Sequence, residues 1–268
     1  MLAPSTIIKK TARTALSGSY LQAVAISCLF IFICFAGMLL SSVGSIFAGN
    51  IGYFLIMAIF AVFAFCPLFF GLLYFFRRLL WGEKDDVLVL FKFFQSAKEY
   101  KRALGLTLIL TVKLTSAALT VFLPCIIVWI LSSERFYSAF DLSFPVWTSS
   151  LWTLNNFLAI IASFVLCFVM LKYYLAPFLL ISDEDMHPAE AVNMSAIISK
   201  STGADFVGLA VSFWWCILAS LLVAPLVFTV PYFVTSYGVH CRFAITSYNR
   251  SVDRFNQKET PHYTTEQL

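Results

Sequence analysis

The residues that could carry out chemistry are few and lie far apart in this chain. Asp183, Glu184 and Asp185 form the densest acidic group, and neighbouring carboxylates can hold a metal ion or activate water. No histidine cluster or glycine-rich phosphate loop accompanies them, and Pro188 and Glu190 follow at the spacing of a helix start. The three carboxylates are therefore predicted to form a solvated loop before a helix.

Sequence motifs of the common enzyme classes are absent from the chain. It contains no GxxxxGK[ST] phosphate loop, no HExxH and no GxSxG turn. Its seven cysteines are scattered through apolar stretches without a CxxC pair, which is typical of packing residues. We predict no catalytic residue, no cofactor and no metal, and thus no enzyme. A membrane enzyme acting on lipid headgroups is the minor alternative.

Some polar side chains lie within apolar stretches. Lys113 is near the middle of one stretch, where a charge is costly and often contacts a substrate or an ion partner. The alternative is that Lys113 reaches the membrane surface by snorkelling, or that the span starts later in the sequence than residue 103. Asn155 and Asn156 lie near the start of the next stretch and are predicted to hydrogen-bond between helices.

Another group lies near the ends of later apolar stretches. Lys172 and Tyr173 occupy the end of one stretch, and Arg242 lies in the last one. Such side chains can bind the phosphate of a lipid headgroup. The alternative is that Lys172 and Tyr173 anchor their helix at the membrane interface. With the lysine and the two asparagines above, these residues are the candidate intramembrane or interface sites.

Six long apolar stretches must position these side chains. Of the 268 residues, 60% are hydrophobic and only 12% are charged, whereas about a quarter are charged in a soluble domain, so the chain is predicted to be integral to a membrane. We predict an all-α, polytopic membrane helical bundle, with cytoplasmic amphipathic helices, that forms a single domain over 1–250 before a polar tail at 251–268. The predicted transmembrane helices are about 20–42, 51–76, 103–131, 151–181, 206–224 and 225–248.

The last apolar region leaves two interpretations open, one span with a tail or two spans. As one helix, the 43 residues from Phe206 to Tyr248 would reach far beyond the roughly 30 Å hydrocarbon core. Two spans with a tight turn near Pro225 are therefore favoured.

The basic residues predict the orientation of these spans. Three lie in the N-terminal segment, seven between the second and third spans, one in the fourth loop and four near the C-terminal end, whereas Arg135 is alone on the other side. By the positive-inside rule, both termini and the second and fourth loops are cytoplasmic, in a plasma membrane. The net charge of +4 then reflects topology, and no nucleic-acid partner is expected.

Polar segments on the cytoplasmic side are predicted to be helical. Residues 1–18 form either an amphipathic lead-in on the membrane surface or a plain positive flank. Residues 188–201 form a helix that starts at Pro188 and ends at a Gly203 cap.

The basic segment between the second and third spans is predicted to be an interfacial helix. Asp85 or Asp86 can cap its start. Its expected apolar face at helical spacing consists of Leu88, Phe91, Phe94, Ala97 and Leu104.

Several short motifs follow one another along the chain in an order that can be compared with known families. They are Pro67, Gly71, Gly82, Glu83 and Leu90–Phe94, then Lys172, Tyr173, Tyr174, Pro177–Leu180, Asp183–Met186, Glu190, Ala191 and Ser195, and finally Pro231, Tyr232 and Tyr248. This order resembles a bacterial family of six-span membrane proteins catalogued as a domain of unknown function. That family is distantly related to the membrane domain of glycerophosphodiester phosphodiesterases. The resemblance implies six spans and supplies no catalytic residues. His187 and Pro188 depart from the small polar cap expected at that point.

These features together favour a non-enzymatic scaffold or accessory protein. It is expected to bind membrane lipids, or a membrane or cytoplasmic protein partner, through its cytoplasmic amphipathic helices. The acidic loop at 183–185 and the basic loop at 77–102 are predicted to face each other and to form the functional surface. The alternative is a small transporter or exporter of lipid-like or amphiphilic compounds, in which Lys113, Asn155 and Lys172 would line one cavity.

Overall fold

The fold is all-α, as predicted. The computed structural model describes residues 5–83, 86–133, 138, 148–219 and 223–259, and every regular element within these ranges is a helix. Three apolar helical stretches are long enough to cross a membrane, namely Tyr20–Leu80, Ala97–Leu131 and Ser150–Ser182. They are compatible with a multi-pass membrane protein. The predicted spans at 206–224 and 225–248 are not among these three stretches.

The helices follow one another with few interruptions. In chain order they are α1 (Ser5–Ser17), α2 (Tyr20–Phe60), the π-helical turn η1 (Ala61–Phe65), α3 (Cys66–Leu80), the 3-10 helix η2 (Val87–Phe91), α4 (Lys92–Gln95), α5 (Ala97–Leu131), α7 (Thr148–Leu171), α8 (Ala176–Ser182), α9 (Pro188–Val211), α10 (Trp214–Ala219) and α11 (Val223–Glu259).

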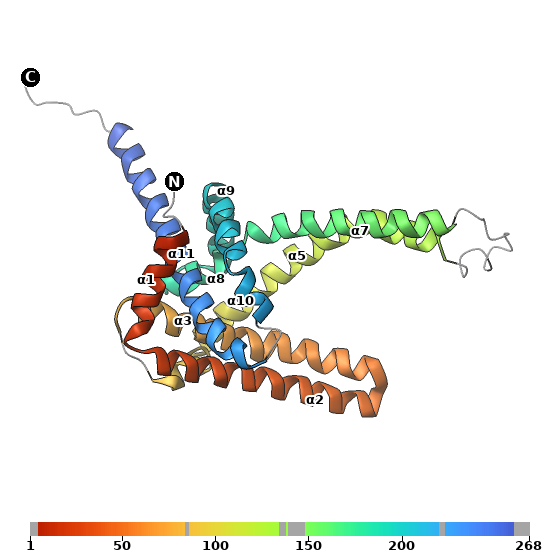
Figure 1. Ribbon diagram of the computed structural model, residues 1–268, viewed down its shortest axis with the longest axis horizontal. Helices are drawn as coiled ribbons and strands as arrows, with labels where there is room; N and C mark the ends of the chain where they lie inside the picture. The colour runs from red at the N-terminus through yellow and green to blue at the C-terminus, as the bar shows by residue number, and fades with distance from the viewer. Residues whose placement is uncertain (1–4, 84–85, 134–137, 139–147, 220–222, 260–268) are drawn as a thin grey trace, which may run out of the picture.

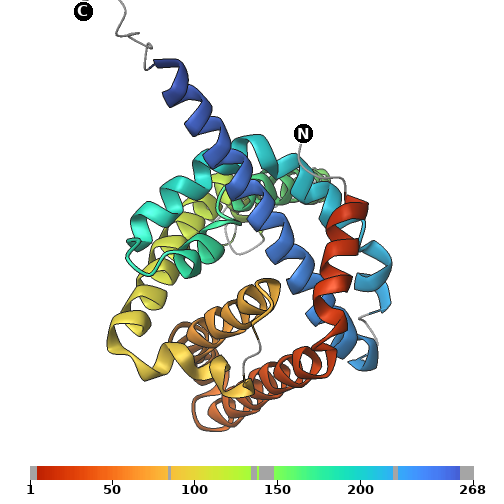
Figure 2. The ribbon, with the colours of Figure 1, turned by 90° about the vertical axis from the view of Figure 1, so that its left-hand side faces the viewer.

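Two long helical hairpins extend from a cluster of shorter helices (Figure 1). The first hairpin is α2 with η1 and α3, because α2 reverses direction at Ala48 and Gly49, where Gly49 has a φ of 59°. The second hairpin is α5 packed against α7. The cluster, here called the hub, contains α1, α3, η2, α4, the first half of α5, α8, α9 and α11. Figure 2 shows the hub end-on, with α1 beside α11.

Small residues let the two arms of the first hairpin approach closely. A Cβ added at Gly52 would overlap the carbonyl oxygen of Gly44, and one added at Gly37 would overlap the ring of Phe60. Close backbone approach through small residues is a common way to pair apolar helices in lipid. The spacing of these glycines therefore explains how α2 folds back on itself.

The hub has an apolar core in which α3 lies directly on η2. Phe75 and Phe76 of α3 and Leu90 of η2 are almost fully buried. The contact is so close that a Cβ added at Gly71 would overlap the carbonyl oxygen of Leu90.

The predicted apolar face of the segment 85–104 is wrong. Leu90 and Phe93 are buried, whereas Leu88 is 65% exposed and Phe94 is 43% exposed. The reason is that a 3-10 helix and one α-helical turn replace a continuous α-helix, and Ser96 is extended, so the 3.6-residue period does not apply. The predicted cap is confirmed at Asp86, whose Oδ1 accepts a hydrogen bond from the Val87 amide at 2.7 Å.

The predicted helix end at Gly203 is also wrong. Pro188 and Glu190 lie in the first turn of α9 as expected, but α9 continues through Gly203 to Val211. Burial of Leu209 near the other end of α9 outweighs the low helix propensity of one glycine, which costs about 1 kcal/mol. The predicted start of a span at 206 thus lies inside a helix.

The two ends of the chain differ from the sequence prediction as well. The N-terminal segment is helical, but its apolar stripe of Ile8, Ala12 and Leu16 is buried within the hub rather than left for a membrane surface. At the other end, α11 continues to Glu259, so the first part of the predicted tail at 251–268 is helical. The predicted division of the fourth span is confirmed, because α7 ends at Leu171 and α8 starts just before Pro177.

The close approach of α3 to η2 predicts a strong effect of one added methyl group. Gly71→Ala should lower the free energy of unfolding by about 1–3 kcal/mol because a Cβ cannot fit against Leu90. Gly208→Ala is the matched control, since nothing lies within 4 Å of a Cβ at that helical position. The measurement is thermal unfolding of the purified proteins in detergent, and equal midpoints for the two variants would contradict the packing described.

Candidate functional site

The acidic and basic loops do face each other, as predicted. Lys92 Nζ lies 3.8 Å from a Glu184 carboxylate oxygen, and Lys98 Nζ lies 3.5 Å from Asp185 Oδ1. Lys92 also lies 3.7 Å from the centre of the Tyr74 ring. The two loops are therefore held together by contacts between their own charges.

Two arginines make the stronger part of this contact at the C-terminal end of α8. Arg102 Nη2 donates to the carbonyl oxygens of Leu180, Asp183 and Met186 at 3.2, 2.6 and 3.0 Å. Arg77 donates to the carbonyl oxygen of Ile181 at 2.6 Å. The last carbonyls of a helix have no partner within it, so such donors are stabilising.

These contacts change the interpretation of the facing loops. Arg77, Lys92, Lys98 and Arg102 are engaged with groups of their own chain. A charge that is already paired contributes little attraction for an external ligand. The two arginines therefore fasten the facing loops to each other, and the role of these loops as a functional surface stays a prediction.

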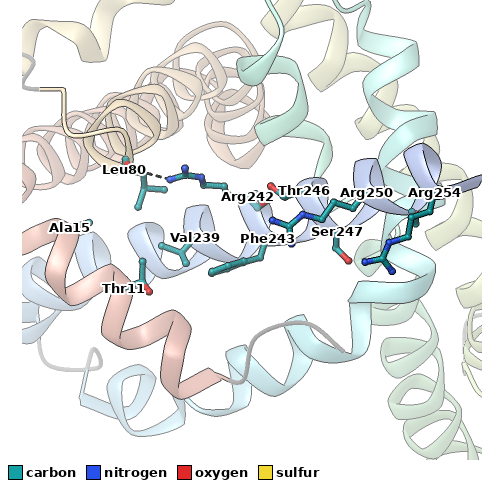
Figure 3. A pocket seen from close by; sticks show the side chains of 11 residues that line it. Thr11, Ala15, Leu80, Val239, Arg242, Phe243, Thr246, Ser247, Arg250 and Arg254 are labelled. Carbon is teal, nitrogen blue, oxygen red and sulfur yellow. Dashed lines mark hydrogen bonds between the residues drawn. The ribbon is translucent and has the colours of Figure 1, made fainter. Parts of the chain in front are cut away.

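A different basic surface lies between α1 and α11, and it is here called the basic groove (Figure 3). It encloses about 680 Å³. It is lined by Thr11 and Ala15 of α1, Leu80 of α3, and Val239, Arg242, Phe243, Thr246, Ser247, Arg250, Ser251 and Arg254 of α11. Arg250 and Arg254 are one turn apart on α11, and Arg242 lies two turns before Arg250, rotated by about 80° around the helix.

The packing of α1 explains why the groove exists. Ile8, Ala12 and Leu16 form the buried stripe by which α1 packs in the hub, so Thr11 and Ala15 lie beside that stripe and line the groove. Lys9 fixes the other side of α1 by donating to the Ser212 carbonyl oxygen at 2.8 Å.

The rotation of α11 is set by a buried polar network that the sequence analysis did not identify. The Tyr174 hydroxyl is 2.9 Å from Thr202 Oγ1 and 3.0 Å from His240 Nε2, and the Phe206 ring stacks on Tyr174. His240 is fully buried, and Arg242 follows two residues later, about 200° around the helix. Holding His240 inside the hub therefore turns Arg242 outward, where its guanidinium lies against Trp81.

The positive charge of the groove has no acidic counterpart in its lining. No Asp or Glu is among the eleven lining residues. Arg242 lies 4.8 Å from the Trp81 ring centre and makes a long contact of 3.5 Å with the Leu80 carbonyl oxygen. Arg250 and Arg254 form no ion pair or hydrogen bond with the residues that the structure describes. Guanidinium groups bind phosphate and carboxylate well, so the groove has the chemistry of an anion site.

Lys113 and Tyr173 lie together, but away from the basic groove. Lys113 Nζ lies 5.5 Å from the centre of the Tyr173 ring. Both residues line a separate shallow recess of about 460 Å³, together with Ser116, Thr120 and Val169. This recess is located where α5 leaves the hub, since Ala103 and Leu106 earlier in α5 are buried there.

The remaining predicted site residues are not brought to this recess. Asn155 is half-buried and its Oδ1 has no hydrogen-bond partner among the described residues, while Asn156 is exposed. The carbonyl oxygen of Lys172 accepts hydrogen bonds from Ser195 and Ser199 at 3.0 and 3.2 Å. Lys113, Asn155 and Lys172 do not line one cavity, and among the predicted site residues only Arg242 lines the basic groove.

Two residues of the groove were missed because of the predicted tail. Arg250 and Arg254 were counted as cytoplasmic charges but not as a site. The signal that could have found them is their spacing of four residues, which makes Arg250 and Arg254 neighbours on one helix.

The arginine contacts to α8 predict that Arg102 is needed for stability. Arg102→Ala should reduce the free energy of unfolding by about 1–3 kcal/mol, because three carbonyl oxygens lose a donor. The neighbouring exposed Lys101 is the control, and Lys101→Ala should change stability by less than about 0.5 kcal/mol. Chemical denaturation in detergent measures both, and a similar small effect of the two variants would contradict this role of Arg102.

The chain was compared with protein-family models, with curated proteins and with solved structures. It gives no match in any of the three comparisons.

Proposed function

We propose that the protein is a non-enzymatic scaffold or accessory protein of the plasma membrane that binds membrane lipid or a membrane protein partner through the cytoplasmic end of its hub. The observation that carries this proposal is the basic groove, in which Arg250 and Arg254 have no partner among the described residues. The other strongly charged region of the hub, the pair of facing loops, is engaged with itself.

The arrangement of the helices supports a membrane location for the two hairpins. Large apolar side chains are exposed along them, with Phe47 85% and Ile51 78% exposed near the turn of the first hairpin. In water such surfaces would favour association, whereas in a bilayer they contact lipid. Each hairpin therefore provides two crossings.

The proposed topology has six crossings with both termini in the cytoplasm. The two ends of the described chain and both charged loops gather at the end of the molecule opposite the turn of the first hairpin (Figure 1). The third pair of crossings would be formed by the end of α9 with α10 and by the first half of α11. Together with the resemblance to a six-span family, the concentration of basic residues in the hub supports this orientation.

The alternative of a transporter has less support. It requires a polar path through the apolar helices, but Lys113 lies beside Tyr173 in a shallow recess that Asn155 and Lys172 do not line. Lys113 at the edge of the hub is better explained by snorkelling to the membrane interface.

The topology predicts opposite labelling at two positions. In a variant whose native cysteines are replaced by alanine, Asn50→Cys should react with a membrane-impermeant maleimide in intact cells, because Asn50 follows the turn of the first hairpin. Ser251→Cys on α11 should react only after the membrane is permeabilised. Labelling of Ser251→Cys in intact cells would contradict the proposed orientation.

The binding role predicts that material bound to the protein depends on the groove. The full chain would be purified from membranes in mild detergent, and co-purifying anionic lipid and protein would be quantified. Arg250→Glu with Arg254→Glu should reduce the amount of co-purifying anionic lipid or of co-purifying protein by about tenfold. The reason is that two charges that attract an anionic ligand are replaced by two that repel it. Lys101→Glu with Lys200→Glu is the control, with the same charge change at exposed positions outside the groove. Equal recovery of lipid and protein from all three proteins would contradict the proposal.

A further inference from the structure

The basic groove differs in polarity from one end to the other. Around its α1 end the lining includes Ala15, Val239 and the partly exposed ring of Phe243, with the charge of Arg242 held against Trp81. Toward the end of α11 the lining is Arg250 and Arg254, with the Ser247 hydroxyl between the two regions (Figure 3). A ligand that fits both ends must carry an apolar part and an anionic part.

The spacing of the arginines identifies the anionic part. Arg250 and Arg254 are one helical turn apart, so their Cα atoms are separated by about 6 Å along α11. Two guanidinium groups at this spacing can share one tetrahedral anion, each donating more than one N–H. Like charges one turn apart repel each other, and a bound anion removes this repulsion. Thr11 and Ser247 add hydroxyl donors that make no hydrogen bond to other described residues.

The direction of the groove matches that of a lipid at the cytoplasmic surface. The C-terminal end of α11 points away from the hairpins (Figure 1), and Val239 precedes Arg254 along α11. If the hairpins cross the bilayer, the apolar end of the groove is toward the membrane and the cationic end is toward the cytoplasm. The groove volume of about 680 Å³ is within the usual range of small-molecule binding sites.

We propose that the basic groove binds an anionic amphiphile with a phosphate headgroup, held by Arg250 and Arg254, whose first apolar carbons contact Val239 and Phe243. This inference rests on the proposed function and names the ligand class of the same site. Arg242 is a positioning residue, because its guanidinium lies against Trp81 at the end of α3 and keeps that wall of the groove in place. An acidic peptide of a membrane partner is the rival occupant, but it would not need the apolar end.

The test uses the full chain in uncharged detergent and native mass spectrometry with dioleoyl phosphatidate as the probe. Wild type should bind one phosphatidate at least about tenfold more tightly than dioleoyl glycerol, which lacks the phosphate. Arg250→Ala with Arg254→Ala should remove this preference, whereas Lys101→Ala with Lys200→Ala should retain it. Both pairs are exposed, and unchanged unfolding midpoints would show that the variants are folded.

Two further arms separate the sources of phosphate. Phe243→Ala should weaken phosphatidate binding but leave the binding of inorganic phosphate unchanged, because only the apolar contact is lost. If inorganic phosphate competes as well as phosphatidate does, the proposal that the ligand is an amphiphile is wrong, and the groove is a simple anion site.

Equal phosphatidate binding by wild type and the Arg250→Ala with Arg254→Ala variant would overturn the inference completely. If that variant nevertheless loses a co-purifying protein, the groove binds an acidic protein segment. The inference then fails while the proposed function stands. If neither lipid nor protein depends on the two arginines, both fail.

Discussion

The structure depends on how the carbonyl oxygens at the end of α8 are satisfied. α8 is a short helix that follows a break in the chain, and its last carbonyls point into a partly buried region between the two hairpins. Arg77 from α3 and Arg102 from α5 donate to them, and in doing so they join the first hairpin, the second hairpin and the start of α9. The last carbonyls of α8 have no partner within the helix, and these arginines satisfy them.

The contacts of Arg77 and Arg102 with the end of α8 determine where the remaining helices pack. α9 follows α8 directly, and its Ser195 hydroxyl accepts from the Leu175 amide and donates to the Lys172 carbonyl, which closes the break between α7 and α8. Tyr174 then reaches Thr202 and His240, so α9 and α11 are held against the same break. With α11 fixed in rotation, Arg242 faces away from His240 and lines the groove. The position of Arg242 is thus a consequence of contacts made at the opposite side of α11.

The sequence predicts the coarse organisation because that organisation follows from hydropathy and charge. Long apolar stretches give helices, Pro177 marks the start of α8, and Asp86 caps η2 as a short side chain at a helix start usually does. The sequence fails where tertiary contacts override local preference. Burial of Leu90 and Phe93 in a 3-10 and α-helical combination could not be derived from a 3.6-residue period, and Gly203 does not end α9 because burial beyond it is more favourable.

The candidate site was harder to predict than the fold for a related reason. Charge counts showed that the facing loops carry many basic residues, but they could not show that the cations contact carbonyls and carboxylates of the same chain. Depth along a span was also counted from Ala103, although Ala103 and Leu106 are buried in the hub, which moves Lys113 toward the edge of the hub. Which charges remain available to a ligand is a property of the packed molecule alone.

The central claim is that the basic groove, and not the pair of facing loops, is the surface that meets a ligand. Hydrogen exchange of the full chain in nanodiscs of neutral lipid, with and without anionic lipid, tests it most directly. The account predicts that anionic lipid slows exchange along α1 and along α11 between Val239 and Arg254, while residues 86–102 and 182–187 exchange at unchanged rates. Slower exchange confined to the facing loops, with α1 and α11 unaffected, would contradict it.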